Sequence, residues 1–485
     1  MSDAERLAAR AGALHVVVVG GGMAGLVSAL QCAKIGLQVT VVEASDRLGG
    51  VLRTAEVAGL SFDVGAESFA TRGGHVRALV DDLGLADAVV RPQGGRAWVA
   101  GLPGGGAAPL PAGGLLGIPV NPFADDVRAV IGWRGAWRAY ADRLRPVLTI
   151  GTATSLGALV RSRLGERVVD RLVAPVTSGV YSAHPDDIDV DAAAPGLNAA
   201  LTRSGSLLGA VAAVVGERTA APGAAVEGLD GGMSRLVDAL CERLDALGVR
   251  FLTGTPVERI DARPDGGWEI VVAPAEGEEP DIVAADAVIV ATHEAEARRL
   301  LAPHAPGLAA ASPAPAPVVE IVTLVLDAPA LDAHPRGSGV LTVPGSHTAK
   351  ALTHSSAKWA WVARDAGARH VVRVSFGSQG ESPATSDLDD ASAIALAAVE
   401  ASALLGVALG QDSVVAGHRE RYMQSQPGSA IGQADASAQA RAAIVGVPGL
   451  GAAGAWLSGT GLAQVVPDAL AEGERVRRAL LWEAH

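Results

Sequence analysis

The order of elements near the N-terminus constrains the fold of this chain more than any other feature of its sequence. Residues 15–19, His-Val-Val-Val-Val, are rich in β-branched side chains and predict a strand of a parallel sheet buried on both faces. Glycines at positions 20, 22 and 25 follow with the spacing G-x-G-x-x-G. Such glycines permit a tight turn, let a pyrophosphate approach the backbone and allow a helix to pack closely on the strand. A βαβ unit that binds a dinucleotide is therefore expected.

The next two elements support this interpretation. Residues 26–34 predict a helix whose N-terminal amides and dipole would face the pyrophosphate. Residues 38–42, Gln-Val-Thr-Val-Val, predict a second strand, and Glu43 at its end is placed to accept hydrogen bonds from a ribose diol. An ordinary glycine-rich turn does not require helix, strand and acid in this order, so nucleotide binding is favoured over that alternative.

Composition excludes several classes of function. The chain has 485 residues, long enough for two or three domains, and its 49% hydrophobic and 19% charged residues are typical of an ordered globular protein. A formal net charge of −13 opposes binding to nucleic acid. The two cysteines, Cys32 and Cys241, provide neither a disulfide framework nor the spacing of a zinc site, so we expect no metal centre and a cytoplasmic location.

Two apolar stretches could be mistaken for membrane spans. Residues 16–33 carry no charge, but the glycines in their middle argue against both a signal peptide and a span. Residues 391–410 contain Glu400 and predict a buried helix. No membrane-spanning segment is expected.

Later segments predict returns of the chain to the nucleotide-binding sheet. Residues 227–236 are expected to open a helix, and residues 249–257 predict a strand and turn. Residues 286–292 predict another buried strand, and the glycine-rich residues 454–466 precede a final helix through about Arg478.

The residues after Glu43 distinguish FAD from NAD. The sequence Asp-Arg-Leu-Gly-Gly at 46–50, followed by Arg53 and Thr54, resembles the second signature of the flavin amine oxidase and protoporphyrinogen oxidase superfamily. In these relatives the segment that matches residues 62–69, Phe-Asp-Val-Gly-Ala-Glu-Ser-Phe, lies beside the flavin. The resemblance implies a tightly held, non-covalent FAD.

Several inserted segments give a more specific resemblance, to bacterial protoporphyrinogen and coproporphyrinogen oxidases and to the actinobacterial branch in particular. These segments are residues 65–68 with 71–72, 109–112, 116–119, 174–181, 205–208, 350–359 and 373–377. The resemblance implies an FAD-dependent oxidase of haem biosynthesis that removes six hydrogens from coproporphyrinogen III to give coproporphyrin III and reduces O2 to H2O2. It also implies that flavin N5 carries the chemistry, without a catalytic side chain.

The expected fold is α/β, with a Rossmann-like FAD-binding domain, an inserted α+β substrate-binding domain and a helical subdomain. Residues 1–80, 227–310 and 447–485 are assigned to the FAD-binding domain. Residues 81–226 and 311–446 are assigned to the substrate-binding domain, with a helical segment at about 121–210. The prolines between 302 and 320 predict a semi-rigid connection between the two.

The resemblance also implies a set of FAD contacts. These residues are Gly20, Gly21, Gly22, Met23, Ala24, Gly25, Glu43, Ala44, Arg47, Gly50, Gly65, Ala66, Glu67, Ser68, Val257, Tyr422, Gly461, Leu462, Ala463, Gln464 and Val465. Tyr422 stands where the family usually has a tryptophan, and residues 423–429 lack the family's Leu-Pro-x-Tyr. The family's frequent proline is absent after Leu462, so the contacts in that turn are assigned by position alone.

Substrate propionates require cations, and arginine binds carboxylates in a bidentate manner. Lysine occurs only at positions 34, 350 and 358. The substrate candidates are therefore Arg72, Lys350 and Arg421, with Arg203 and Lys358 considered beside them. A solvated surface charge is the alternative for each of them. Trp133 and Trp137, at helical spacing, favour packing over a substrate platform.

Three other functions stay open at this point. The enzyme could act on protoporphyrinogen IX, or it could be another flavin amine oxidase or desaturase-like enzyme. A different class is a carrier that retains FAD and binds a tetrapyrrole without turning it over. The resemblance also leaves open a transient contact of the stretch 121–148 with a ferrochelatase or a membrane surface.

Overall fold

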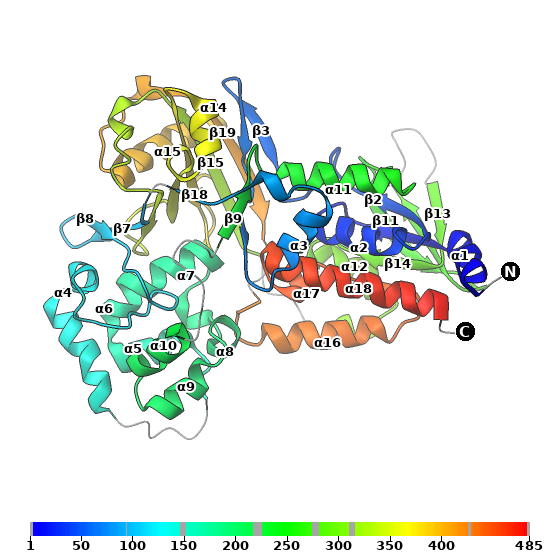
Figure 1. The fold of residues 1–485 in the computed structure, drawn as a ribbon, viewed down its shortest axis with the longest axis horizontal. Helices are drawn as coiled ribbons and strands as arrows, with labels where there is room; N and C mark the ends of the chain where they lie inside the picture. Colours follow the sequence, from blue (N-terminus) through cyan, green and yellow to red (C-terminus); the bar gives the residue numbers. More distant parts are fainter. Residues whose placement is uncertain are drawn as a thin grey trace.

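The computed structural model describes residues 3–93, 95–145, 152–216, 226–273, 281–309, 316–424 and 428–482. Figure 1 shows a nucleotide-binding lobe that carries both termini, a second sheet beside it, and a layer of helices below that sheet. Among the described residues, no helix combines the length and apolarity needed to cross a membrane.

The nucleotide-binding lobe is built on a parallel five-stranded sheet. Its strands, in spatial order, are β10 (Arg250–Leu252), β2 (Gln38–Val42), β1 (His15–Val19), β14 (Ala287–Val290) and β20 (Leu450–Ala452). Every neighbouring pair is parallel. The central strands are almost wholly buried, as their β-branched residues require. The predicted Rossmann-like fold is confirmed.

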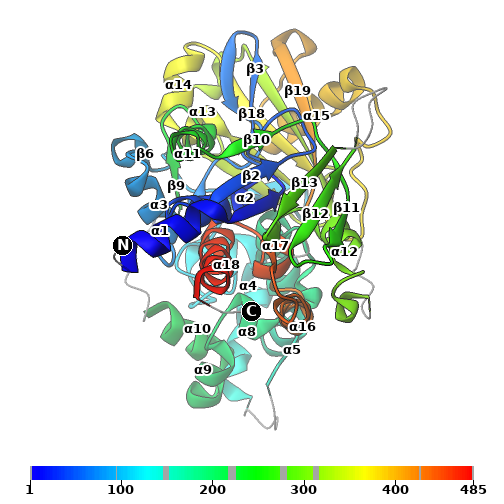
Figure 2. The same cartoon turned by 90° about the vertical axis from the view of Figure 1, so that its right-hand side faces the viewer.

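Helices and a small sheet cover the two faces of this parallel sheet (Figure 2). One face packs against α1 (Asp3–Ala13), α2 (Met23–Ala33), α3 (His75–Asp82), α11 (Ser234–Ala246) and α18 (Leu462–Trp482). The other packs against β11 (Val257–Ala262), β12 (Trp268–Val272), β13 (Asp281–Ala285), α12 (Glu294–Leu301), α16 (Gln433–Val445) and α17 (Ala455–Ser458).

α2 begins earlier than the sequence pattern indicates. Its first residue is Met23 rather than Leu26, because Gly22 is already an extended N-cap and its carbonyl accepts the first intrahelical bond, from Leu26. The glycine turn is therefore only three residues long.

The second lobe contains a seven-stranded sheet. The strand order is β19 (Val414–Met423), β15 (Val318–Leu326), β18 (His370–Phe376), β17 (Ala351–His354), β16 (Gly339–Thr342), β7 (Trp98–Leu102) and β8 (Gly106–Pro109). α15 (Asp390–Leu405) covers one face. This is the buried helix expected at 391–410, and it ends at Gly406 in the left-handed conformation.

Short elements join the lobes. The hairpin of β3 (Thr54–Val57) and β4 (Leu60–Asp63) leads into β5 (Phe69–Ala70), which pairs with β9 (Val226–Leu229), as does β6 (Val89–Val90). α13 (Ser355–Lys358) and α14 (Ala360–Ala366) lie between β17 and β18 in the chain.

The helical layer forms a separate apolar core beneath the seven-stranded sheet. Its helices are α4 (Asp125–Tyr140), α5 (Leu156–Leu164), α6 (Glu166–Val168), α7 (Ala174–Tyr181), α8 (Val190–Ala193), α9 (Leu197–Ser204) and α10 (Leu207–Gly216). These helices occupy nearly the stretch expected at about 121–210.

Some residues outside the range expected for the FAD-binding domain pack in the core of the nucleotide-binding lobe. The buried Ala88 and the half-buried Leu83 and Leu85 pack in the core of the nucleotide-binding lobe, beyond the boundary expected at residue 80. Buried residues of α16 pack against the other face of the same sheet, although the sequence assigned them to the second domain. Of the predicted proline connection, residues 310–315 lie outside the described part of the chain.

Candidate functional site

The turn between β1 and α2 requires glycine at two positions. Gly20 has φ +107°, and a Cβ there would lie 2.6 Å from the Ala291 carbonyl oxygen. A Cβ on Gly25 would lie 1.9 Å from the Gly20 carbonyl oxygen. The helix therefore approaches the strand as closely as two backbones allow, which leaves the first amides of α2 at the carboxyl edge of the sheet.

The side chain of Glu43 stabilises this turn through hydrogen bonds. Its carboxylate accepts a hydrogen bond from the Gly21 amide at 2.6 Å and from the Ser45 amide and hydroxyl at 2.8 and 2.7 Å. The carboxylate thus lies beside the glycine turn at the end of β2, where a nucleotide ribose is expected. Its contact with that ribose stays a prediction.

Replacing Glu43 with alanine is expected to weaken FAD binding by about ten- to a hundred-fold, because a charged hydrogen bond of this type contributes roughly 1.5–3 kcal/mol. FAD retention during dialysis, followed by flavin absorbance, measures the effect. The exposed Glu56, on strand β3, gives the control Glu56→Ala. Equal retention by both variants and the unaltered protein would contradict the assignment.

The second glycine signature lies directly on the first. The Gly49 amide donates to the Gly21 carbonyl at 2.8 Å, and a Cβ on Gly50 would lie 3.3 Å from the Gly22 Cα. Arg47 and Ala44, two other predicted contacts, are exposed at the same edge. The two glycine segments thus form a single cradle of backbone.

A second helix N-terminus opens at the same edge of the sheet. The Ser28 hydroxyl donates to the Ala469 carbonyl, and the Cys32 thiol contacts the Gly473 carbonyl, so α2 and α18 run in parallel, side by side (Figure 2). Gly461, before α18, has φ +101° and open space around it. Both helices therefore direct their positive dipole ends to one place, which suits the diphosphate and the carbonyl edge of a flavin.

The other predicted residues of that turn lie in the first turn of α18. Leu462 is buried, Ala463 is half-buried, and the amides of Gln464 and Val465 donate to the Gly461 carbonyl. Val257 begins β11, and its carbonyl accepts a hydrogen bond from Arg299 at 2.8 Å. The Thr255 amide donates to the Glu43 carbonyl, which brings Val257 to the nucleotide edge.

The loop after β4 is clamped from the seven-stranded sheet. Arg373 donates to the carbonyls of Val64 and Gly65, and its guanidinium lies 2.9 Å from Glu67 Oε2. Lys358 Nζ lies 2.5 Å from the other oxygen of Glu67. Burial would raise the pKa of Glu67, but Lys358 and Arg373 lower it to about 2. The Glu67 side chain is therefore bound within the protein, which leaves its backbone for the predicted flavin contact.

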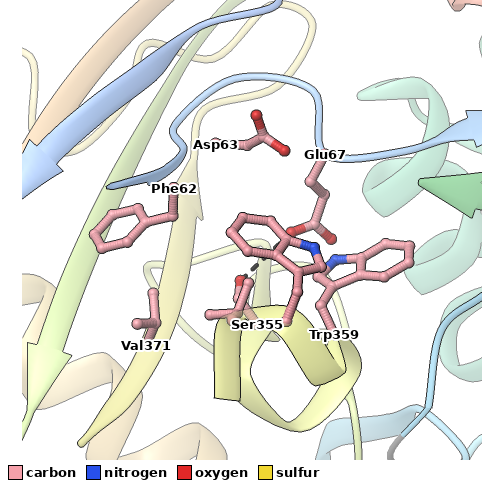
Figure 3. Close-up of a pocket in the computed structure, with 8 residues that line it drawn as sticks. Phe62, Asp63, Glu67, Ser355, Trp359 and Val371 are labelled. Atoms are coloured by element: carbon pink, nitrogen blue, oxygen red, sulfur yellow. Dashed lines mark hydrogen bonds between the residues drawn. The ribbon is translucent and has the colours of Figure 1, made fainter. Parts of the chain in front are cut away.

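A small cavity lies beside this clamp (Figure 3). It has room for about one water molecule. Figure 3 shows Asp63, Glu67 and Trp359 around it, and Ser355 donates to Glu67 at 3.4 Å. The indole nitrogen of Trp359 is buried without a partner in the described chain. This cavity is too small for a substrate.

The face of the seven-stranded sheet opposite α15 carries polar side chains beside apolar ones such as Ile321, Val325 and Val371, and we call it the polar sheet face. Directly opposed residues in antiparallel strands share a face. By this register Tyr422, Glu420, His418, Thr323, Arg373, Ser375, Ala351 and Thr353 lie on one face. The contacts of Arg373 show that this face turns toward the loop at residues 64–67. We expect the substrate to lie against this face.

The residues present fit FAD. The Tyr422 hydroxyl lies close to Gly65, where a Cβ would approach it to 2.9 Å, and it is buried without a hydrogen-bond partner in the described residues. The hydroxyl of Thr323 and Nε of Arg373, on neighbouring strands, are also buried and unpaired there. Buried polar groups need partners, and the polar rim of a flavin would supply them between the sheet and the glycine cradle.

The predicted substrate cations differ in their exposure and in their partners. Arg72 is exposed. Lys350 donates to the Ser182 hydroxyl at 2.7 Å. Arg421 is bound to Glu320, with Nε 2.6 Å from a carboxylate that is almost fully buried, so its charge is already balanced. Of the others, Arg203 is exposed and Lys358 is paired with Glu67.

Sequence reasoning missed the roles of Arg373 and Ser182. Arg373 lay in a recognised segment, but nothing in the sequence links it to Glu67. Ser182 follows α7 with φ +53°, and no local pattern predicts that it meets a lysine from a distant strand. Part of the segment that departs from the family, residues 425–427, lies outside the described chain.

Comparisons with known proteins agree with this geometry. The family model of flavin containing amine oxidoreductases matches residues 23–481. The chain is 34% identical over 458 residues to the coproporphyrinogen III oxidase of Mycobacterium tuberculosis (strain ATCC 25618 / H37Rv), which covers 92% of this chain and 93% of the relative. It is 32% identical over 472 residues to that of Mycobacterium leprae (strain TN), with 96% and 98% covered.

Solved structures show the same fold. A crystal structure from Exiguobacterium sp. 255-15, assigned as a protoporphyrinogen oxidase, matches with a TM-score of 0.81 at 24% identity, covering 96% of this chain and 98% of that one. An engineered putrescine oxidase matches with a TM-score of 0.66 at 16% identity, covering 97% and 100%. The predicted family, fold class and flavin cofactor are thereby confirmed. The chain belongs to the flavin-containing amine oxidoreductase family, and it is an oxidoreductase whose cofactor is FAD.

Proposed function

We propose that this protein oxidises coproporphyrinogen III to coproporphyrin III in haem biosynthesis, removing six hydrogens and reducing O2 to H2O2. The observation that carries the proposal is the 34% identity, over 92% of the chain, to a relative named coproporphyrinogen III oxidase. The structure adds a nucleotide cradle that faces the polar side of a second sheet.

In this proposal the residues of the chain position the FAD and the substrate and neutralise their negative charges, while the cofactor supplies the redox step. When bound, FAD provides the hydride acceptor. The first amides of α2 and α18 would face its negative groups, and Glu43 holds the glycine turn in place. Arg373 fixes the loop at residues 64–67 against the sheet. For the substrate, the protein needs a dry space and cations for the propionates, the proposed role of Arg72 and Lys350, whereas Arg421 is bound to Glu320.

Anaerobic mixing with coproporphyrinogen III tests the proposal. Bleaching of the flavin absorbance with formation of coproporphyrin III is the expected result. Binding of the porphyrin without bleaching would identify the carrier instead. Bleaching by amines but not by porphyrinogens would identify an amine oxidase-like enzyme. Either of these results would overturn the proposal.

Steady-state kinetics should distinguish the two porphyrinogens. Coproporphyrinogen has four propionates and protoporphyrinogen has two, so a site with cations for four leaves charges unpaired when the smaller acid binds. We expect kcat/KM to favour coproporphyrinogen III by at least about tenfold, with about three H2O2 per porphyrin formed. Rates and peroxide are measured with both substrates under air. Equal kcat/KM values would leave a general porphyrinogen oxidase, and a higher kcat/KM with protoporphyrinogen IX would favour the protoporphyrinogen alternative.

The surface of α4 supports a peripheral contact. We call Phe123, Trp133, Trp137 and Tyr140 the aromatic surface, because their rings lie against one another. Trp133 and Trp137 are 60% and 61% exposed, and the Arg128 guanidinium lies 4.2 Å from the Trp133 ring. Exposed aromatics beside arginines suit the interface of a membrane with anionic lipids. Transient contact with such a membrane is proposed, and a ferrochelatase is the alternative partner.

Changing both Trp133 and Trp137 to serine is expected to weaken binding to anionic lipid vesicles on the order of tenfold, because two apolar rings leave the interface. Cosedimentation with vesicles that contain phosphatidylserine measures the bound fraction. Trp482→Ser, at an equally exposed tryptophan on α18, is the matched control. No vesicle binding by the unaltered protein would leave the protein partner as the alternative.

A further inference from the structure

Lys350 directly precedes β17, a central strand of the seven-stranded sheet, and its backbone is fixed there. Its amide donates to the Ser375 carbonyl at 2.9 Å, and its carbonyl accepts from the Thr342 amide at 3.2 Å and hydroxyl at 2.9 Å. The backbone is thus held by strands on both sides. Only the side chain of Lys350 has freedom to adapt to a ligand.

The ammonium group meets a neutral partner. Lys350 Nζ donates to the Ser182 hydroxyl at 2.7 Å, and Ser182 is buried. The Ser182 carbonyl in turn accepts the Gln379 amide at 2.7 Å, so α7 is tied to the end of β18 at this point. Burial lowers the pKa of Lys350 to about 8, and no charge contributes to the shift. A hydroxyl positions the ammonium but does not balance its charge.

Several other buried or half-buried cations in the described chain have carboxylate partners, whereas the half-buried Arg336 is held by the backbone carbonyls of Ala403 and Leu404. Arg373 and Lys358 share Glu67, and Arg163 lies 2.5 Å from the buried Asp142. Within the described chain, Lys350 has no salt bridge. Lys350 is half-buried, and a charge that is partly withdrawn from water without a counter-charge is unfavourable, so it is expected chiefly where a ligand brings the opposite charge.

The nearby acid is engaged elsewhere. Glu400 of α15 approaches the loop before Lys350, but it accepts hydrogen bonds from the amides of Thr348 and Ala349 at 3.4 and 3.2 Å. Its other neighbour is His347, at 3.6 Å. The carboxylate of Glu400 therefore holds the loop rather than the ammonium of Lys350.

The position of Lys350 matches the expected substrate space. Leu341 pairs with Ala351, and Ala351 shares the polar sheet face with Tyr422. The strands β17 and β19 are separated by three spacings, about 14 Å, which suits a tetrapyrrole with its propionate arms. Gly179 of α7 packs on Leu341, where a Cβ would lie 2.6 Å from the leucine side chain. Lys350 thus lies where the helical layer meets this face.

We infer that Lys350, positioned by Ser182, binds one propionate of the substrate and fixes how the tetrapyrrole lies against the polar sheet face. This inference rests on the proposed function and assigns one carboxylate of that substrate to one side chain. It separates Lys350 from Arg421, whose charge Glu320 already balances.

Binding of the stable product tests the inference without turnover. Coproporphyrin III is titrated into the FAD-loaded full-length protein at pH 7, and quenching of porphyrin fluorescence gives Kd. Lys350→Met should weaken binding by about ten- to a hundred-fold, because a charge-assisted bond is lost. Lys350→Arg should restore most of the affinity. Lys34→Met, at an exposed lysine that ends α2, should leave Kd unchanged.

Two further measurements separate recognition from structure. The tetramethyl ester of coproporphyrin III carries no carboxylates, so it should bind the unaltered protein and Lys350→Met equally. Lys350→Met should also raise or preserve Tm, because it removes an unbalanced buried charge. An unfolded Lys350→Met protein, or an unchanged Kd for coproporphyrin III, would overturn the inference. Failure of the unaltered protein to oxidise coproporphyrinogen III would instead overturn the proposed function.

Discussion

Replacing Gly25 with alanine is expected to abolish FAD binding and to destabilise the protein by at least about 3 kcal/mol. The new Cβ would lie 1.9 Å from the Gly20 carbonyl oxygen, and the backbone of both residues is held in place by the sheet and α2. The turn can relieve this overlap only by moving α2 away from β1. That movement also displaces the amides that face the diphosphate.

Gly12→Ala is the matched control for this change. Gly12 is also a helical glycine, in α1, but it is exposed, and a Cβ there would have nothing within 4 Å. Alanine in an open helical position stabilises by roughly 0.5–1 kcal/mol. Thermal unfolding and the FAD content of the purified proteins measure both variants. Retention of FAD by Gly25→Ala, with Tm close to that of Gly12→Ala, would contradict the close approach of helix and strand.

The elements that were predicted best from sequence are those specified by a short, continuous sequence pattern. Residues 15–19 and 38–42 are strands with the predicted bounds, because β-branched runs of this length have few alternatives. Glu43 lies at the turn because it follows β2 directly. The start of α2 differed by three residues, since Gly22 already serves as its N-cap and hydrophobic periodicity does not reveal a cap of this kind.

Long-range pairings could not be predicted in the same way. Glu67 was predicted to contact FAD, and its side chain binds Arg373, 306 positions away in the chain, and Lys358. Arg421 was expected to be available to a propionate, and β15 places Glu320 directly opposite it. No pattern within either segment specifies these partners, because they depend on which strands pair.

The same limit explains why the seven-stranded sheet was not foreseen in detail. β7 and β8 come from residues 98–109, yet they extend a sheet whose other strands lie between residues 318 and 423. The parallel pairing of β7 with β16 places the helical layer, which follows β8 in the chain, beneath this sheet. Lys350 meets Ser182 only as a result of that connection.

Because of Asp63, the free energy of unfolding is expected to fall as pH rises between about 4 and 7. Burial raises the pKa of Asp63 from its ordinary value of 3.8 to about 7. The Met233 amide, 2.9 Å from both carboxylate oxygens, and Arg373 offset this only in part. Because the folded pKa exceeds the unfolded one, the contribution of Asp63 is fully present below about pH 4 and is lost as pH rises through about 7. The shift corresponds to a loss on the order of 4 kcal/mol.

Asp63→Asn should remove this pH dependence, because the amide keeps an acceptor for the Met233 amide and carries no charge at any pH. Urea unfolding of the FAD-loaded protein from pH 4 to 8 gives the free energy of unfolding for each variant. Asp87→Asn, at an exposed carboxylate, controls for the loss of one surface charge. The difference between Asp63→Asn and the unaltered protein should grow with pH, since only the buried carboxylate must ionise beside the clamp of Glu67 and Arg373. A constant difference across this range would mean that Asp63 is already ionised at pH 4 and that its two contacts with the Met233 amide outweigh its burial.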